Sequence, residues 1–203
     1  MAVVFLLLML AITAGFNASP GAAAPAVPGK APASAAAVAF LRTVCNDTLK
    51  TDAQSCYDEL LPYAESFKGN EAKVAEVATT IFVTKVRATR EEMRGVTAKA
   101  VDPNLGDEQG GCILMYEIAA CGKDTDLALQ SLRLLAATDV AKQRTTEDMR
   151  IVTNWMDKAE IYVYQCEMNL ALEDSYYTKL PHYKFLALSM QIASPLIRAI
   201  KTT

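Results

Sequence analysis

The sequence predicts an all-α protein, in which an antiparallel up-down-up-down bundle of four helices follows a short N-terminal helical hairpin. The chain is 52% hydrophobic but only 7% aromatic, and its many Ala and Leu residues favour helices over strands. Four long stretches are amphipathic, and in 112–135 and 146–171 the apolar residues recur at alternating steps of three and four, which is the spacing of one buried helix face. The polar turns between these stretches are short, and short connections favour antiparallel neighbours.

The stretch from Cys112 to Leu135 has the clearest pattern of the four. Its buried face is expected to consist of Leu114, Ile118, Cys121, Thr125, Ala128, Leu132 and Leu135. Gly122 lies inside this pattern and costs about 1 kcal/mol relative to Ala, so we expect a kink or a close helix approach there. The stretch 146–171 has the same spacing in Met149, Val152, Met156, Ala159, Val163, Cys166 and Leu170. The first stretch begins at Cys112, and the second carries Cys166 on its apolar face. The two predicted helices therefore resemble a pair joined by a disulfide.

The other two long stretches are residues 71–101 and 184–200. The first is expected to bury Val74, Val77, Ala78, Ile81, Ala88 and Met93, and the second Leu186, Met190, Ala193, Ile197 and Ile200. Pro195 should kink the last helix. Residues 101–111 are expected to interrupt the helices because they contain the breakers Pro103, Gly106, Gly110 and Gly111.

Charged side chains cover the outer faces of the stretch 71–101. Arg87 and Glu91 are spaced as an i,i+4 ion pair. We expect the cations of this stretch to form a solvated helix face, with a basic patch as the alternative. These cations are Lys85, Arg87, Arg90 and Arg94.

Two short helices, 35–44 and 53–63, are expected to form the hairpin ahead of the bundle, with Ser34 and Asp52 as their N-terminal caps. Cys45 and Cys56 flank the polar turn between them, and a disulfide there would contribute about 3 kcal/mol. Asn46-Asp47-Thr48 in this turn is an N-glycosylation sequon. An unmodified Asn46 is the alternative.

The N-terminus has the pattern of a secretory signal. Residues 1–29 contain no charged side chain, and the apolar run 3–14 is shorter than the roughly 18 residues that a membrane span needs. We expect residues 1–24 to be a cleaved signal peptide and 25–34 a flexible Ala/Pro-rich spacer, followed by the helical domain at 35–203. The alternative for the apolar run is a buried N-terminal helix. The mature protein is expected to be secreted, without membrane association.

Secretion affects the interpretation of the five cysteines. In an oxidising compartment four would pair and one would remain, and four cysteines allow three connectivities. Cys121 lies on the predicted buried face, so it is most simply a buried small hydrophobic residue. Partner exchange and a dimer link are the alternatives for this thiol.

The sequence lacks the patterns of the common catalytic and metal sites. The one histidine, His182, follows Pro181 in a predicted loop, and no Cys/His cluster has zinc spacing. There is no phosphate-binding glycine loop, no GxSxG motif and no evident carboxylate pair. The net charge of −3 argues against nucleic acid as a partner. We therefore predict no enzyme activity, no catalytic residue, no metal and no cofactor, and expect the function to lie on the surface.

Several residues, taken in order, resemble the plant invertase/pectin methylesterase inhibitor domain over about residues 36–201. They are Phe40-Leu41-Arg42-Thr43-Val44-Cys45 with Thr48, Cys56 followed by Leu60, Cys112 with Tyr116 one turn later, Cys166 with Glu167, and the apolar closing helix Leu186–Ile200. The resemblance implies a four-helix bundle with an N-terminal hairpin. It also implies the disulfides Cys45–Cys56 and Cys112–Cys166, with Cys121 as the free thiol. The longer bridge would contribute about 4 kcal/mol.

The resemblance implies a monomeric inhibitor of a pectin methylesterase or an acid invertase in the apoplast, or alternatively the vacuole. It would dock over the target's active-site cleft. Met149-Arg150-Ile151 stands where invertase-type members often carry Pro-Lys-Phe, and the separation of Cys112 from Cys166 is longer than usual, which predicts an enlarged tip. The candidate target contacts at this tip are Asp139, Lys142, Arg144, Glu147, Asp148 and Arg150; the alternative for them is a solvated turn. The alternatives for the whole protein are a non-inhibitory secreted interaction or signalling module of the same fold and a lipid carrier.

Overall fold

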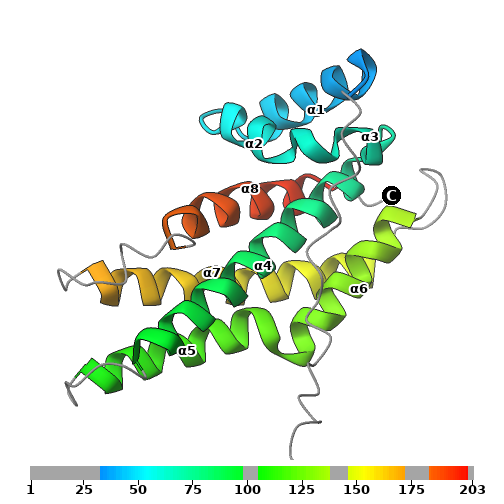
Figure 1. The fold of residues 1–203 in the computed structure, drawn as a ribbon. Helices are drawn as coiled ribbons and strands as arrows, with labels where there is room; N and C mark the ends of the chain where they lie inside the picture. Colours follow the sequence, from blue (N-terminus) through cyan, green and yellow to red (C-terminus); the bar gives the residue numbers. More distant parts are fainter. Residues whose placement is uncertain (1–32, 98–104, 138–145, 172–182, 201–203) are drawn as a thin grey trace, which may run out of the picture.

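The computed structural model describes residues 33–97, 105–137, 146–171 and 183–200, and all regular structure in these ranges is helical (Figure 1). The prediction of an all-α protein is therefore confirmed. The elements are α1 (Ala35–Thr48), α2 (Ala53–Leu60), the 3₁₀ helix η1 (Leu61–Tyr63), α3 (Ala64–Phe67), α4 (Glu71–Thr97), α5 (Leu105–Cys121), α6 (Lys123–Ala137), α7 (Thr146–Ala171), the 3₁₀ helix η3 (Tyr183–Phe185) and α8 (Leu186–Ala199).

Helix α4 is the central element, because it packs against α8 on one side and against α5 and α6 on the other. Helix α7 packs against α5, α6 and α8 and completes the core. Helices α1 and α2 form a hairpin that lies beside α8 in Figure 1, away from α5. The largest fully buried side chains are Tyr116, Phe67, Phe82, Leu41, Leu60, Met93, Leu132, Leu135, Met156, Leu186 and Ile192.

Trp155 lies where α4, α6 and α7 meet. Only 4% of its surface is exposed, and its indole N–H donates a hydrogen bond of 3.1 Å to Thr125 Oγ1. Its ring meets that of Phe82 edge to face, with centroids 6.3 Å apart. The Thr125 hydroxyl in turn donates to the Ala119 carbonyl at 3.2 Å. This chain of contacts connects α4, α5, α6 and α7 in the interior.

The predicted helix over 112–137 is broken at Gly122 into α5 and α6. In α6 the predicted face is correct, since Thr125, Ala128, Leu132 and Leu135 are buried. In α5 it is wrong, because Leu114 is 59% and Ile118 44% exposed. The disulfide holds Cys112 inward, and Tyr116, one turn later, shares its face. A single periodic pattern assumes one continuous helix, and the break at Gly122 changes which face of α5 is inward.

The glycine-rich stretch is helical where the structure describes it, which is also contrary to expectation. Helix α5 begins at Leu105, so Gly106, Gly110 and Gly111 lie inside it. Each glycine costs about 1 kcal/mol relative to Ala, and the packing of α5 against α4 and α7 offsets this cost.

Some of the helix caps and helix bounds predicted from the sequence agree with the structure, and others do not. Ser34 Oγ accepts from the Ala37 N–H at 3.3 Å, which confirms this cap. Asp52 makes no side-chain cap, because its carboxylate accepts from the Thr51 hydroxyl at 3.1 Å. Helix α1 continues to Thr48, four residues beyond the predicted end, whereas α7 has the predicted bounds. Pro195 lies inside α8.

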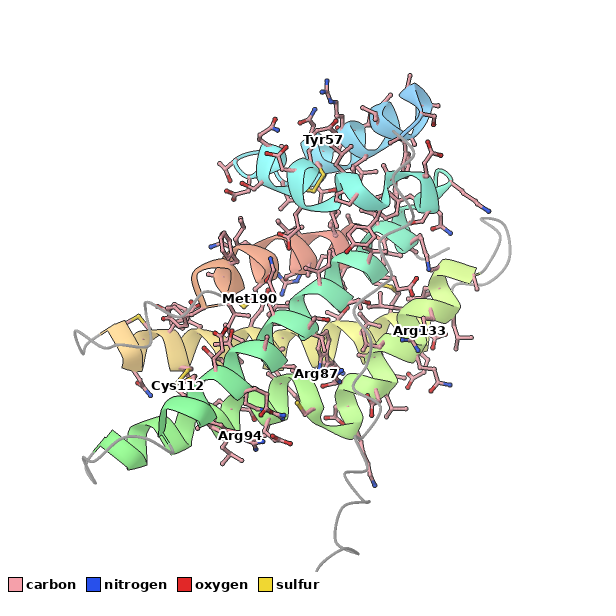
Figure 2. The ribbon with its side chains drawn as sticks, viewed as in Figure 1. Tyr57, Arg87, Arg94, Cys112, Arg133 and Met190 are labelled. Atoms are coloured by element: carbon pink, nitrogen blue, oxygen red, sulfur yellow. A yellow bond between two sulfur atoms is a disulfide. The ribbon has the colours of Figure 1, made fainter. Side chains whose placement is uncertain are left out.

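The predicted solvated face of α4 is instead a set of links between helices (Figure 2). Arg90 and Arg94 both pair with Glu117 of α5, and Lys85 pairs with Glu59 of α2. Arg87 Nε donates to the Ala120 carbonyl at 2.8 Å rather than pairing with Glu91. Glu91 pairs with Arg90 and Arg94. The Arg87–Glu91 prediction was therefore wrong.

Candidate target-contact surface

The end of α6 and the start of α7 lie at one end of the molecule, on the right in Figure 1. Of the predicted contact residues, Glu147, Asp148 and Arg150 lie in the first two turns of α7. Asp139, Lys142 and Arg144 lie outside the described residues. The structure therefore shows the position of only half of the predicted contact residues, and their role as target contacts stays a prediction.

Glu147 and Arg150 pair with each other through two parallel hydrogen bonds. Arg150 Nε and Nη2 donate to the two carboxylate oxygens of Glu147 at 2.8 and 2.6 Å. The hydrogen bond from Arg150 holds the pKa of the Glu147 carboxyl below its ordinary value. An acidic target would have to compete with Glu147 for the guanidinium of Arg150, so this cation is less available than the sequence suggested.

A pocket of about 530 Å³ opens at the same end of the bundle. It is lined by Ser66, Phe67, Lys68, Gly69, Asn70, Lys73, Glu76, Arg133, Ala136 and Ala137. Lys68 and Gly69 have positive φ angles of 49° and 75° and turn the chain from α3 into α4. Asn70 Nδ2 then donates to the Ala136 carbonyl at 2.8 Å, which fastens the start of α4 to the end of α6. Sequence reasoning missed this pocket because its two walls, residues 66–76 and 133–137, are at least 57 residues apart in the chain.

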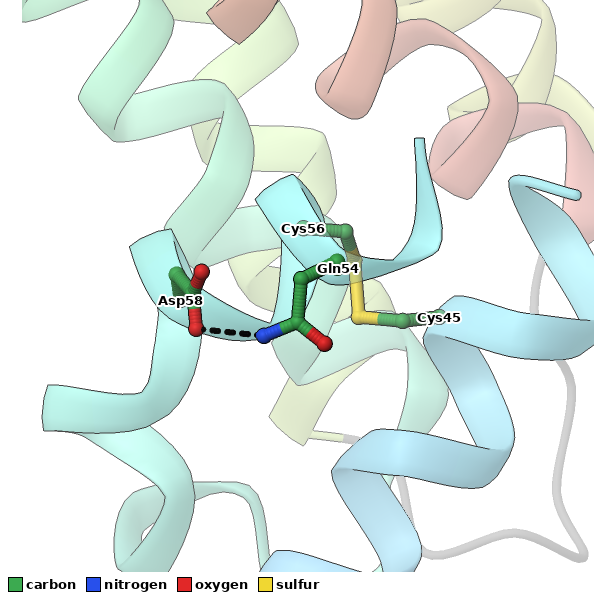
Figure 3. The surroundings of a disulfide bond; sticks show 4 residues. All are labelled: Cys45, Gln54, Cys56 and Asp58. Carbon is green, nitrogen blue, oxygen red and sulfur yellow. Dashed lines mark hydrogen bonds between the residues drawn. A yellow bond between two sulfur atoms is a disulfide. The ribbon is translucent and has the colours of Figure 1, made fainter. Parts of the chain in front are cut away.

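The two disulfides fix the helices that surround this core. Cys45–Cys56 joins α1 to α2 (Figure 3), beside a hydrogen bond of 2.8 Å from Gln54 to Asp58 within α2. Cys112–Cys166 joins α5 to α7, with Cα atoms 5.1 Å apart. All four cysteines of the two disulfides are buried.

Cys121 is the unpaired cysteine, at the last residue of α5. It is half-buried, whereas the sequence predicted a buried small hydrophobic residue. Arg90 Nη1 approaches its sulfur at 2.6 Å. Cys121 packs against the edge of the core, next to the ion pairs between α4 and α5.

Asn46 is exposed, as a glycosylated asparagine must be. It lies in the last turn of α1 rather than in the turn between the two hairpin helices, because α1 extends to Thr48. Its glycosylation remains a prediction.

Both α5 and α7 carry large apolar side chains that are exposed. Ile161, Tyr164 and Met168 follow one another at steps of three and four along α7, and Leu114 and Ile118 do so on α5. The two helices pack together and share the Cys112–Cys166 bridge. These residues are called the α5–α7 apolar face below.

A buried tyrosine lies near this bridge, beside two half-buried titratable side chains. Tyr116 follows Cys112 by one turn, and its hydroxyl is buried without a hydrogen-bond partner among the described residues. Burial raises the pKa of Tyr116, as does its proximity to Tyr183 and Glu167. Burial also raises the pKa of Glu167 and of Tyr183.

Replacing Tyr116 with phenylalanine is expected to increase the free energy of unfolding by about 1 kcal/mol, because it removes a buried hydroxyl whose desolvation is uncompensated. Urea unfolding of the two proteins measures the difference. A loss of stability would show that the hydroxyl has a partner in the folded protein.

The carboxyl of Glu167 should make stability depend on pH. Its folded pKa lies above the ordinary value of 4.5, so the folded state holds a proton that the unfolded state has released. Stability is then highest below the unfolded pKa and falls as pH rises through the folded pKa. Glu167→Gln should flatten this dependence and raise the melting temperature near neutral pH.

Melting temperatures of wild type and Glu167→Gln, measured from about pH 4 to about pH 7, test this expectation. Glu160→Gln is a control on the same helix, because Glu160 pairs with Arg198 in the fold. If Glu167→Gln and wild type keep a constant difference across the range, burial of this carboxyl does not shape the pH profile.

No helix among the described residues is long and apolar enough to cross a membrane. In the same ranges, no group of three or more His, Cys, Asp or Glu side chains is placed to hold a metal ion.

A helical core with two disulfides, one in an N-terminal hairpin and one between two long helices, defines a class of disulfide-stapled helical proteins. The family model described as plant invertase/pectin methylesterase inhibitor matches residues 39–194, and the chain belongs to this family. An uncharacterized protein of Oryza sativa subsp. japonica is 38% identical over 186 residues, which cover 86% of this chain and 80% of that protein. No solved structure matches the chain. Members of the family are inhibitors rather than enzymes.

Proposed function

We propose that the chain is a secreted proteinaceous inhibitor of a carbohydrate-active enzyme, either a pectin methylesterase or an acid invertase. It would dock over the active-site cleft of its target and contribute no chemistry of its own. The observation that carries this proposal is the family match over residues 39–194. The two disulfides support it, because a pre-ordered surface loses less conformational entropy on binding.

The two targets would use different surfaces. A pectin methylesterase would contact exposed faces of the bundle helices, and the exposed apolar side chains of the α5–α7 apolar face would be part of that contact. An acid invertase would receive the tip, where Lys142, Arg144 and Arg150 would meet its carboxylates. The pairing of Arg150 with Glu147 favours the first of these modes.

In the whole chain, the packing of α4, α5–α6, α7 and α8 would be the antiparallel up-down-up-down bundle, with the α1–α2 hairpin as an arm. Residues 1–24 would be removed as a signal peptide, 25–34 would be a spacer, and 35–203 the inhibitor domain. The mature protein would act as a monomer in the apoplast, or in the vacuole, without cofactor, metal or nucleic acid.

The test is inhibition of a purified pectin methylesterase and a purified acid invertase by the oxidised mature protein, at several pH values. Inhibition of one enzyme is expected, with Ile161→Ser/Tyr164→Ser weakening inhibition if that enzyme is the methylesterase. Arg150→Gln should weaken inhibition instead if it is the invertase. Failure against both enzymes, with circular dichroism showing folded protein, would contradict the inhibitor proposal.

The second candidate is a non-inhibitory secreted interaction or signalling module of the same fold. The 54-residue separation of Cys112 from Cys166, longer than usual for the family, favours it. Folded protein that inhibits neither enzyme and recovers neither enzyme type from apoplastic fluid would support this candidate.

A further inference from the structure

The pocket between α3, α4 and α6 is positively charged, although the whole chain has a net charge of −3. Lys68, Lys73 and Arg133 line it from three different elements, and Glu76 is its one carboxylate. The lining therefore carries an excess of two positive charges. Sequence separation hides this cluster, since Lys68 and Arg133 are 65 residues apart.

Glu76 cannot neutralise all three cations. Its carboxylate pairs closely with Lys73, and it lies 3.9 Å from Arg133 Nε. Arg133 is 67% exposed, so its guanidinium retains most of its hydrogen-bonding capacity. Lys68 is exposed and has no ion-pair partner among the described residues. Two cations at the pocket are thus available to a negatively charged ligand.

The backbone N–H groups at the start of α4 are not what would attract a negatively charged ligand to the pocket. Its first N–H groups are already engaged, because Asn70 Oδ1 accepts from Ala72 at 3.0 Å and from Lys73 at 3.3 Å. The site is therefore formed by side chains of defined position. Arg133 offers a planar guanidinium, which matches a carboxylate through two parallel hydrogen bonds.

The rest of the lining suits a sugar ring. The Ser66 hydroxyl donates to the Tyr63 carbonyl at 2.6 Å and keeps lone pairs that can accept hydrogen bonds. Ala136 and Ala137 supply apolar surface, and the buried ring of Phe67 lies beneath them. The volume of about 530 Å³ lies within the range of roughly 300–1,000 Å³ for small-molecule sites.

We propose that this pocket binds a uronic-acid unit of an acidic oligosaccharide, with its carboxylate held by Arg133 and Lys68. The overall negative charge of the chain disfavours non-specific attraction of polyanions. Recognition must then come from this local cluster. The proposal concerns a second binding activity and does not depend on inhibition of an enzyme.

The experiment is calorimetric titration of the oxidised mature protein with short galacturonic acid oligomers. We expect saturable binding that weakens as salt is added, because exposed charges are screened. The same oligomers with their carboxyls methyl-esterified should bind at least tenfold more weakly. Chemical shifts of the Gly69, Ala136 and Ala137 amides should change on addition of the acid form.

Two double variants localise the effect. Lys68→Gln/Arg133→Gln should reduce affinity at least tenfold. Lys123→Gln/Lys158→Gln removes the same charge near the opposite end of α6, where Nζ of Lys158, on α7, lies 3.5 Å from Oδ2 of Asp124. This control variant should bind the oligomers as wild type does. Circular dichroism establishes that both variants are folded.

Several results would overturn the proposal. They are absence of binding to the acid oligomers, equal binding of the esterified form, equal binding of inorganic phosphate, and equal loss in the two double variants. Enzyme inhibition by Lys68→Gln/Arg133→Gln is measured separately, so that failure of saccharide binding and failure of inhibition remain distinguishable.

Discussion

Removal of the Cys112–Cys166 bridge, in the variant Cys112→Ala/Cys166→Ala, is expected to lower the free energy of unfolding by about 4 kcal/mol on the chain-entropy model. The bridge closes a loop with a sequence separation of 54, against 11 for Cys45–Cys56. The corresponding variant of the shorter loop, Cys45→Ala/Cys56→Ala, should lose about 3 kcal/mol. Urea unfolding at one fixed pH measures both losses through the midpoint and the slope.

Packing should add to the loss, because Cys112 and Cys166 are both buried between α5 and α7. The bridge also sets the inward face of α5, so its removal should weaken inhibition if the α5–α7 apolar face contacts the target. Cys121→Ala is the matched control, since it removes a thiol without removing a bridge. A larger loss for the hairpin variant than for the long-loop variant would contradict the entropic account.

Sequence periodicity was reliable where one helix runs without interruption. Helix α7 has the predicted bounds, and Val152, Met156, Ala159, Val163 and Cys166 of its predicted face are buried. Thr146, with two acidic residues after it, marks the start of this helix. The pattern suffices here because α7 runs without a break from Thr146 to Ala171.

Periodicity failed where tertiary contacts decide which face of a helix is buried. Leu114 and Ile118 continue the pattern of α6 in the sequence, but the break at Gly122 allows α5 to bury Tyr116 and Ala120 instead. The sequence predicts an irregularity at Gly122 but not the direction in which the helix turns. That direction depends on where α4 and α7 lie.

The polar contacts between helices were also beyond sequence reasoning. Arg87 has an acidic residue at i+4, yet its Nε donates to the carbonyl of Ala120 on α5. The positive pocket likewise joins Lys68 to Arg133 only because Asn70 binds the end of α6. Such contacts depend on the spatial neighbours of a side chain, which local spacing does not specify.

Trp155→Ala is expected to lower the free energy of unfolding by about 3–5 kcal/mol, the range for truncating a buried aromatic residue. The side chain is 4% exposed and fills the junction of α4, α6 and α7. Its loss leaves a cavity beside Phe82 and removes the hydrogen bond to Thr125. Urea unfolding, at the pH used for the cysteine variants, measures the effect.

Trp155→Phe separates the two causes. This variant keeps most of the ring and loses the N–H donor, while the Thr125 hydroxyl still donates to the Ala119 carbonyl. Its expected cost is about 1–2 kcal/mol. The Ala119–Thr125–Trp155 chain crosses the break between α5 and α6, so the indole also fastens the two helices to α7. If Trp155→Ala costs no more than Trp155→Phe, the ring does not hold this junction together and the hydrogen bond alone explains its contribution.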